Sequence, residues 1–140
     1  MLFRSAQLRD ILAAFANKGI ETLVLKGLAL GATVYPDPAA RPLADIDLLV
    51  RPQHHPDAVA VLTGLGYRAM TQRFGILQEF QCEDEFHPGR HPTHRTVVEL
   101  HWNLHIAMGV QRVHDLHALF QRAIRVEDRK STRLNSSHRL

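Results

Sequence analysis

Apolar residues near the N-terminus change from a helical spacing to a strand-like run. Spacings of three and four predict a first helix, with Ser5 as its cap and Gly19 as its stop. The next run, ETLVLKG, predicts a short buried strand that ends at Gly27. A second helix is expected over 28–35, because the breaker Pro36 follows it. The apolar face of the first helix consists of Leu8, Ile11, Leu12 and Phe15.

The middle of the chain continues the alternation of strand and helix. ADIDLLV (44–50) predicts a second strand, and a helix over Asp57 to Leu65 is expected to end at Gly66. From Tyr67 onwards the pattern weakens. YRAMT is compatible with a strand, residues 74–80 fit either a strand or a helix, and HPGRHPTHR is typical of a loop.

The last part of the chain predicts one more strand and one more helix. TVVELHW (96–102) is the strand, and Val110 to Val126 is the helix. Its apolar positions are Val113, Leu116, Leu119, Phe120 and Ile124. Residues 129–140 have almost no apolar content, and they resemble adapter-derived ends of metagenomic reading frames, so we expect a disordered or extraneous tail. Residues 1–128 are then expected to form one domain.

Two acids interrupt the apolar run RPLADIDLLV. Asp45 and Asp47 are two positions apart, so they share one face of the predicted strand and are close enough to share a cation. A third acid, Glu99, lies in the last predicted strand and converges on them if the two strands are neighbours. Three carboxylates suit Mg²⁺. The alternative is that these acids are solvated on an open sheet face, paired with Arg41 or Arg95.

The junction at Lys26 and Gly27 adds an expected anion site. A glycine between a strand and a helix lets the backbone approach a ligand closely, and the N–H groups that begin a helix suit an anion. Lys26 places a positive charge beside it. The alternative is that Gly27 is only a turn residue.

Composition narrows the class of protein. The 140 residues are 45% hydrophobic and carry a net charge of +3 without a basic run, which gives little support for duplex nucleic-acid binding. The single Cys82 excludes an intramolecular disulfide and fits a reducing compartment. No apolar stretch reaches the roughly 20 residues of a membrane span, and the N-terminus lacks a signal-peptide pattern, so we expect a cytoplasmic protein without a membrane partner.

Three segments together resemble the uncharacterised nucleotidyltransferase family of the DNA polymerase beta-like superfamily. They are LVLKGLAL, RPLADIDLLV and VVELHWNLH, and the similarity covers roughly Leu12 to Leu104. The resemblance implies an α+β fold, in which helices flank a small mixed β-sheet. It also implies two divalent metal ions, Mg²⁺ or Mn²⁺, and a glycine turn that holds a triphosphate.

The resemblance assigns roles residue by residue. It implies attack by a hydroxyl on the α-phosphate of a nucleoside triphosphate such as ATP, with release of pyrophosphate. The acceptor is a protein, a small molecule or RNA. Glu99, or Asp47 with it, would help to deprotonate the hydroxyl. The catalytic and metal-binding residues would be Asp45, Asp47 and Glu99. The nucleotide-binding residues would be Lys26, Gly27, Arg41 and His101.

This chain departs from the wider superfamily at two positions. Leu28 follows the turn glycine where Ser is usual at or beside the turn, and Glu99 is one methylene longer than the usual Asp. Arg41 is either a phosphate contact or a plain surface residue. His101 shares the face of Glu99 and is expected either to orient it, to contact substrate, or to be a core histidine. Trp102 should point the other way, into the core.

Ten histidines leave a second kind of site open. His87, His91 and His94 lie close together in sequence and near Cys82, which makes a zinc site for hydrolysis conceivable. Their spacing matches no zinc finger, and a solvated loop is favoured. A third hypothesis is a non-catalytic nucleotide-binding or interaction module of the same fold, because related enzymes often need a further helical part to hold the acceptor.

Overall fold

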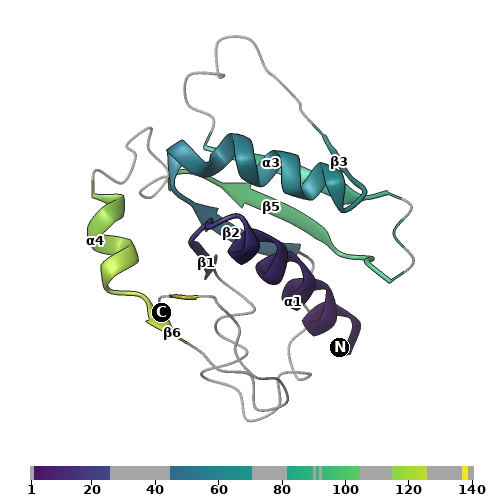
Figure 1. Cartoon of the computed structure of the whole chain (residues 1–140), viewed down its shortest axis with the longest axis horizontal. Helices are drawn as coiled ribbons and strands as arrows, with labels where there is room; N and C mark the ends of the chain where they lie inside the picture. Colours follow the sequence, from purple (N-terminus) through teal and green to yellow (C-terminus); the bar gives the residue numbers. More distant parts are fainter. Residues whose placement is uncertain are drawn as a thin grey trace.

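A computed structural model describes residues 2–25, 45–70, 82–89, 91, 93–104, 115–125 and 137–138. The helices are α1 (Leu2–Asn17), α3 (His55–Gly64) and α4 (Leu116–Gln121), with a short 3-10 turn η2 (Pro52–His54) directly before α3. The strands are β1 (Thr22–Leu25), β2 (Asp45–Val50), β3 (Tyr67–Ala69), β4 (Glu83–Pro88), β5 (Val97–His101), β6 (Ile124–Arg125) and β7 (Ser137–His138). Figure 1 shows their arrangement.

These strands form one mixed sheet in the order β3-β4-β5-β2-β1-β7-β6. β2 pairs with β5 in parallel, and β1 pairs with β7 in parallel, whereas the other neighbours are antiparallel. The α+β fold class expected from the sequence is therefore confirmed. Strand β7 lies beyond residue 128, and the expected division into a domain and a tail stays a prediction.

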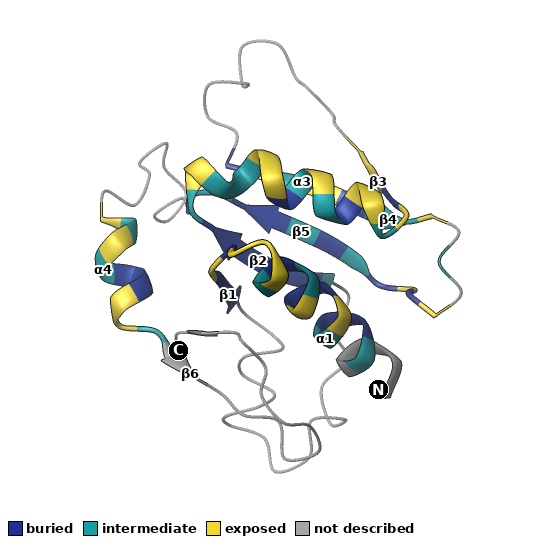
Figure 2. Ribbon diagram, viewed as in Figure 1, coloured by how far each residue is buried: buried dark blue, intermediate teal, exposed yellow. Residues whose placement is uncertain are grey.

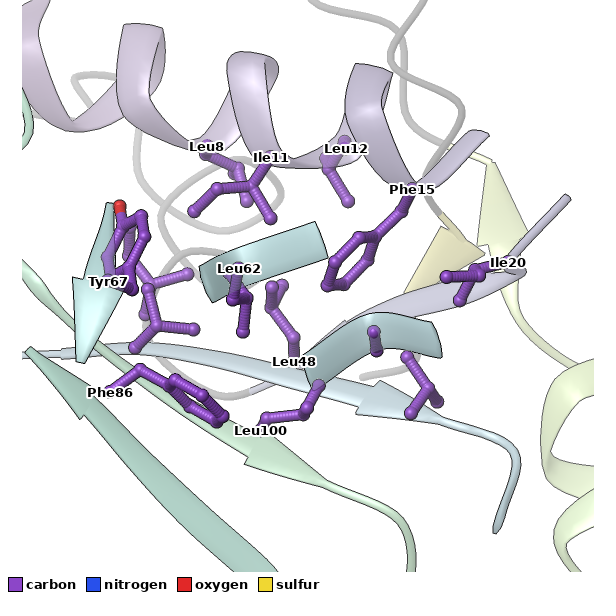
Figure 3. Close-up of a cluster of buried hydrophobic side chains, with 14 of the residues drawn as sticks. Leu8, Ile11, Leu12, Phe15, Ile20, Leu48, Leu62, Tyr67, Phe86 and Leu100 are labelled. Atoms are coloured by element: carbon purple, nitrogen blue, oxygen red, sulfur yellow. The ribbon is translucent and has the colours of Figure 1, made fainter. Parts of the chain in front are cut away.

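Helices α1 and α3 cover one face of this sheet (Figure 1). Their buried side chains meet those of the strands in the main core, which Figure 3 shows in close-up. The strand residues of this core alternate along β2 and β5, as a half-buried sheet requires. They are Ile46, Leu48, Val50, Val98 and Leu100. Figure 2 shows that the outer sides of both helices are exposed.

The opposite face carries a smaller core under α4. Leu23 of β1 and Leu49 of β2 pack there against Leu119 and Phe120 of α4. Arg51 adds a cationic contact, with its guanidinium carbon 4.2 Å from the centre of the Phe120 ring. The smaller core covers the part of this face that β1 and β2 form. The part that β4 and β5 form carries polar side chains instead.

The side chain of Gln7 joins α1 to the sheet. Its Nε2 donates to the Tyr67 hydroxyl and to the Thr96 carbonyl, both at 2.6 Å, and its Oε1 accepts from the Arg95 and Thr96 N–H groups at 3.1 and 3.0 Å. The amide thus supplies hydrogen-bond partners to backbone groups of the segment that leads into β5. Buried backbone groups need such partners.

Several predicted elements agree with the structure. α1 ends where expected, since Gly19 has a φ of 68° and hydrogen bonds from Gly19 and Ile20 close the end of the helix. Ser5 is not its cap, however, because the helix already begins at Leu2. The predicted helix after Pro56, the strand at Tyr67 and the strands at 45–50 and 97–101 are present. No helix in the described part of the chain is long and apolar enough to cross a membrane.

Two predictions for the second half were wrong. The segment beginning HPGR was expected to be a loop, but His87 and Pro88 belong to strand β4. The last helix was expected to continue to Val126, yet α4 ends at Gln121 and β6 follows. The predicted helix over 28–35 and the segment 74–80 lie outside the described residues.

Candidate functional site

Parallel pairing of β2 with β5 sets the position of the predicted acids. The register places Asp47 opposite Glu99 and Asp45 opposite Val97. Because side chains alternate along strands, these positions share the face that lies away from α1 and α3. Asp47 and Glu99 therefore stand side by side, as the sequence predicted for neighbouring strands. Asp47 is buried and Glu99 is partly buried.

His101 completes a compact group with these two carboxylates. Its Nε2 lies 3.2 Å from Asp47 Oδ1 and 3.6 Å from Glu99 Oε2. One potential ligand atom from each of the three residues lies within 4.8 Å of the others. The expectation that His101 shares the face of Glu99 is confirmed. Trp102, the next residue, packs against the His55 ring with 4.3 Å between the ring centres.

The other ring nitrogen of His101 faces a residue that the sequence did not suggest. Nδ1 lies 3.0 Å from Glu83 Oε2, and Glu83 is the register partner of His101 in the β4–β5 pair. A carboxylate only accepts hydrogen bonds, so Nδ1 donates its proton to Glu83. Only the pairing of β4 with β5 reveals this contact, and β4 was not predicted.

The acids around His101 change its pKa. Burial lowers the pKa of the imidazole, but hydrogen bonds from the ring to Asp47 and Glu83 and the negative charges of both acids raise it by more, to about 9. The charged ring therefore compensates the carboxylates when no ion is bound. This contact helps to explain how a buried strand carries the Asp47 carboxylate.

The remaining predicted residues are placed differently. Asp45 is on the same face as Asp47 but outside the three-residue group, so its part in metal binding stays a prediction. Lys26, Gly27 and Arg41 lie outside the described residues. Their predicted contacts with nucleotide stay predictions.

The three-residue group suits a divalent cation by its chemistry. Two carboxylates supply the oxygen ligands that Mg²⁺ and Mn²⁺ prefer, and the imidazole adds a nitrogen donor. Residues on two rigid neighbouring strands need little rearrangement to bind an ion. Asp47, Glu99 and His101 thus fit the ion that the family resemblance implies.

The histidine-rich segment does not form a second such group within the described residues. His94 is buried, with Nδ1 3.0 Å from the Tyr67 hydroxyl and Nε2 2.8 Å from Asp10 Oδ2. His91 stacks on His94 with 3.5 Å between the ring centres, and His87 is ion-paired with Glu85. The expectation of a solvated loop was wrong for His94, which joins α1 to the sheet.

Solved structures of another protein share this fold. A crystal structure of ANT(2″)-Ia in complex with adenylyl-2″-tobramycin matches with a TM-score of 0.55 and 16% identity, over 76% of this chain and 53% of that one. A solution structure of the antibiotic-resistance factor ANT(2″)-Ia matches with a TM-score of 0.51 and 17% identity, over 75% of this chain and 51% of that one. This chain spans about half the length of the solved structures it matches.

Comparison with curated proteins gave no match. The family model described as uncharacterised nucleotidyltransferase, in contrast, matches residues 2–140. The match spans nearly the whole chain and includes β2 and β5, the two strands that carry the acids. This chain belongs to that family of uncharacterised nucleotidyltransferases.

Proposed function

We propose that this chain is a metal-dependent nucleotidyltransferase. It moves a nucleoside monophosphate from a nucleoside triphosphate, such as ATP, to a hydroxyl-bearing acceptor and releases pyrophosphate. The observation that carries the proposal is the close group of Asp47, Glu99 and His101 on two paired strands in a member of this family. A structurally similar protein holds an adenylylated tobramycin, which supports a hydroxyl group as the acceptor.

The reaction requires one bond to form and one to break at the α-phosphorus. The acceptor oxygen bonds to phosphorus, the bond to the bridging oxygen of the β-phosphate breaks, and the electron pair leaves with pyrophosphate. A bound Mg²⁺ or Mn²⁺ would neutralise phosphate charge and make the hydroxyl more acidic. Asp47 and Glu99 hold the ion. Glu99 is the more exposed of the two, and it accepts the hydroxyl proton, with Asp47 assisting.

Asp45 on β2 and three residues outside the described part of the chain complete this proposal. Asp45 would help to hold a second divalent ion. Gly27 gives the phosphates close access to backbone N–H groups, and Lys26 and Arg41 neutralise their charge. These roles rest on the family resemblance and on the positions of the residues in the sequence.

Turnover tests the proposal directly. The protein is incubated with Mg²⁺ or Mn²⁺, each α-labelled nucleoside triphosphate and a panel of protein, RNA and small-molecule acceptors. We expect pyrophosphate and a labelled adduct, and we expect both to disappear in Asp47→Asn. Because that substitution removes an ion ligand, it should slow the chemical step more than it weakens nucleotide binding.

A non-catalytic nucleotide-binding module is the second candidate. The observation that favours it is that the chain spans about half of the solved structures it matches. The two candidates differ in one result. Metal-dependent nucleotide binding without pyrophosphate release, across the whole acceptor panel and also in a chain extended at its C-terminus, would favour the module.

A further inference from the structure

We propose that His101 is itself a ligand of the divalent ion and that Glu83 is the residue that positions it. This inference rests on the proposed function, since it concerns the same ion. It changes the donor set from carboxylates alone to two carboxylates and one imidazole nitrogen. It also gives a role to Glu83, a residue that neither the sequence pattern nor the family resemblance indicated.

The geometry of the ring supports ligation through Nε2. Glu83 Oε2 accepts a hydrogen bond from His101 Nδ1, with 3.0 Å between the two atoms. This contact fixes the rotation of the ring and leaves Nε2 as the nitrogen that faces Asp47 and Glu99. A bound ion would take the place of the proton on Nε2, and the proton on Nδ1 would stay on the ring, hydrogen-bonded to Glu83. Carboxylates commonly orient metal-binding histidines in this way.

The position of Glu83 is itself fixed by its neighbours in the fold. Its strand pairs with β5 so that Glu83 is opposite His101, and the next residue, Asp84, lies 2.9 Å from His55 Nε2 at the start of α3. The two acids alternate across the sheet, one toward His101 and one toward α3. Contacts on both faces thus hold this end of β4 in place.

Strand β4 also supplies matched controls. Glu85 lies two positions from Glu83 on the same face and carries the same charge, but it is opposite Glu99 in the register and its described partner is His87 rather than His101. Glu85→Ala therefore removes an equal charge from the same strand without touching the ring. His87→Asn removes a nearby exposed histidine, and this variant tests whether an adventitious histidine binds the ion.

Pulsed electron paramagnetic resonance of bound Mn²⁺ tests the first part. The full chain, in molar excess over Mn²⁺ and without nucleotide, should show coupling of the electron spin to a histidine nitrogen. We expect this coupling to be lost in His101→Asn and kept in His87→Asn. Bound Mn²⁺ without nitrogen coupling, or coupling that survives in His101→Asn, would overturn the inference and leave the proposed function standing. A chain that binds no Mn²⁺ would overturn both.

Calorimetric titration with Mn²⁺ tests the role of Glu83. Because Glu83 is exposed, its substitution leaves the packed core intact even if His101→Asn fails to fold. We expect Glu83→Ala to weaken Mn²⁺ binding by about tenfold or more, the usual effect of removing such a partner. Glu83→Gln should recover part of this loss, because its amide oxygen still accepts a hydrogen bond from Nδ1. Glu85→Ala removes a charge opposite Glu99 but leaves the ring contact intact, so it should lose much less affinity than Glu83→Ala. Equal losses in Glu83→Ala and Glu85→Ala would show a general effect of charge and overturn the positioning role.

Discussion

At the scale of single residues, Asp47 and Tyr67 each combine burial with a polar group. Asp47 belongs to the three-residue group, and its charge is compensated by the His101 ring. Tyr67 faces the main core, where its hydroxyl meets Gln7 and His94. Asp47 belongs to the proposed chemistry, whereas Tyr67 contributes to the stability of the fold. The two residues are therefore tested by different measurements.

The two acids of β2 should respond differently to substitution. We expect Mg²⁺ or Mn²⁺ to raise the melting temperature of wild type and to have no effect on Asp47→Asn, which lacks a ligand of the three-residue group. Asp45→Asn should keep part of the response, because Asp45 lies outside that group. Thermal melts with and without EDTA measure this. An equal response to metal in wild type and Asp47→Asn would contradict the site.

Tyr67 should make the folded state sensitive to alkaline pH. Burial raises the pKa of its hydroxyl to about 12, while the hydrogen bond from Gln7 lowers it and the charge of Asp10 raises it further. A raised pKa in the folded state means that the stabilisation is complete below pH 10 and is lost between about pH 10 and 12. The loss amounts to about 2–3 kcal/mol in total.

Urea denaturation of wild type and Tyr67→Phe between pH 8 and 11.5 measures this effect. At pH 8 the variant should be less stable by about 1–2 kcal/mol, because Gln7 and His94 lose a buried partner. The difference should shrink as the pH rises above 10, since only wild type carries the ionisable group. A constant difference across the range would show that the burial of Tyr67 does not control the alkaline limit.

At the scale of elements, the buried strands β2 and β5 were predictable and the more exposed strand β4 was not. β2 and β5 have apolar runs because one face of each packs under the helices, and the period of two then placed Asp47 and Glu99 on the other face. In β4 only Phe86 is buried, so its sequence carries little strand signal. The contact between Glu83 and His101 depends on that strand and could not be anticipated. The contacts of Gln7 could not be anticipated either, because its partners are distant in sequence.

The junction between α3, β3 and β4 depends on a close approach of two glycines. A Cβ added to Gly89 would lie 2.5 Å from the Gly66 carbonyl oxygen, whereas a Cβ at Gly64 meets nothing within 4 Å. Gly89→Ala should therefore lower the free energy of unfolding by about 1–3 kcal/mol. Gly64→Ala should raise it by about 0.5–1 kcal/mol, because alanine favours the helix. Denaturant titrations compare the two, and similar values would argue against the close approach.

At the scale of the whole molecule, the two faces of the sheet have different roles: one carries the main core and the other carries the residues proposed for catalysis. One face carries α1, α3 and the main core, and the other carries the three-residue group beside the smaller core under α4. A ligand of the three-residue group therefore contacts the face away from α1 and α3. Because such a ligand binds only the folded state, its binding should stabilise the fold of the whole chain.

Metal and nucleotide should stabilise the chain together more than either does alone. The acids repel a free triphosphate, and a bound ion removes this repulsion. At nucleotide concentrations about 100 times the dissociation constant, the expected gain is about 2.7 kcal/mol. Thermal melts with ATP, with Mg²⁺ and with both measure it, and the joint effect should be smaller in Asp47→Asn. Equal stabilisation by ATP with and without the ion would contradict metal-dependent binding.

The parallel pairing of β2 with β5 also has a consequence for the order of events in folding. Asp47 and His101 are 54 residues apart in sequence, so they meet only after a long loop has closed. Because the entropy of closing this loop must be paid before the contact forms, we expect the pair to form after the rate-limiting step. The ion should then bind after the rate-limiting step, and stopped-flow measurements should show that Mn²⁺ slows unfolding while the refolding rate stays the same. A chain still emerging from the ribosome would acquire its metal affinity only once β5 has been synthesised.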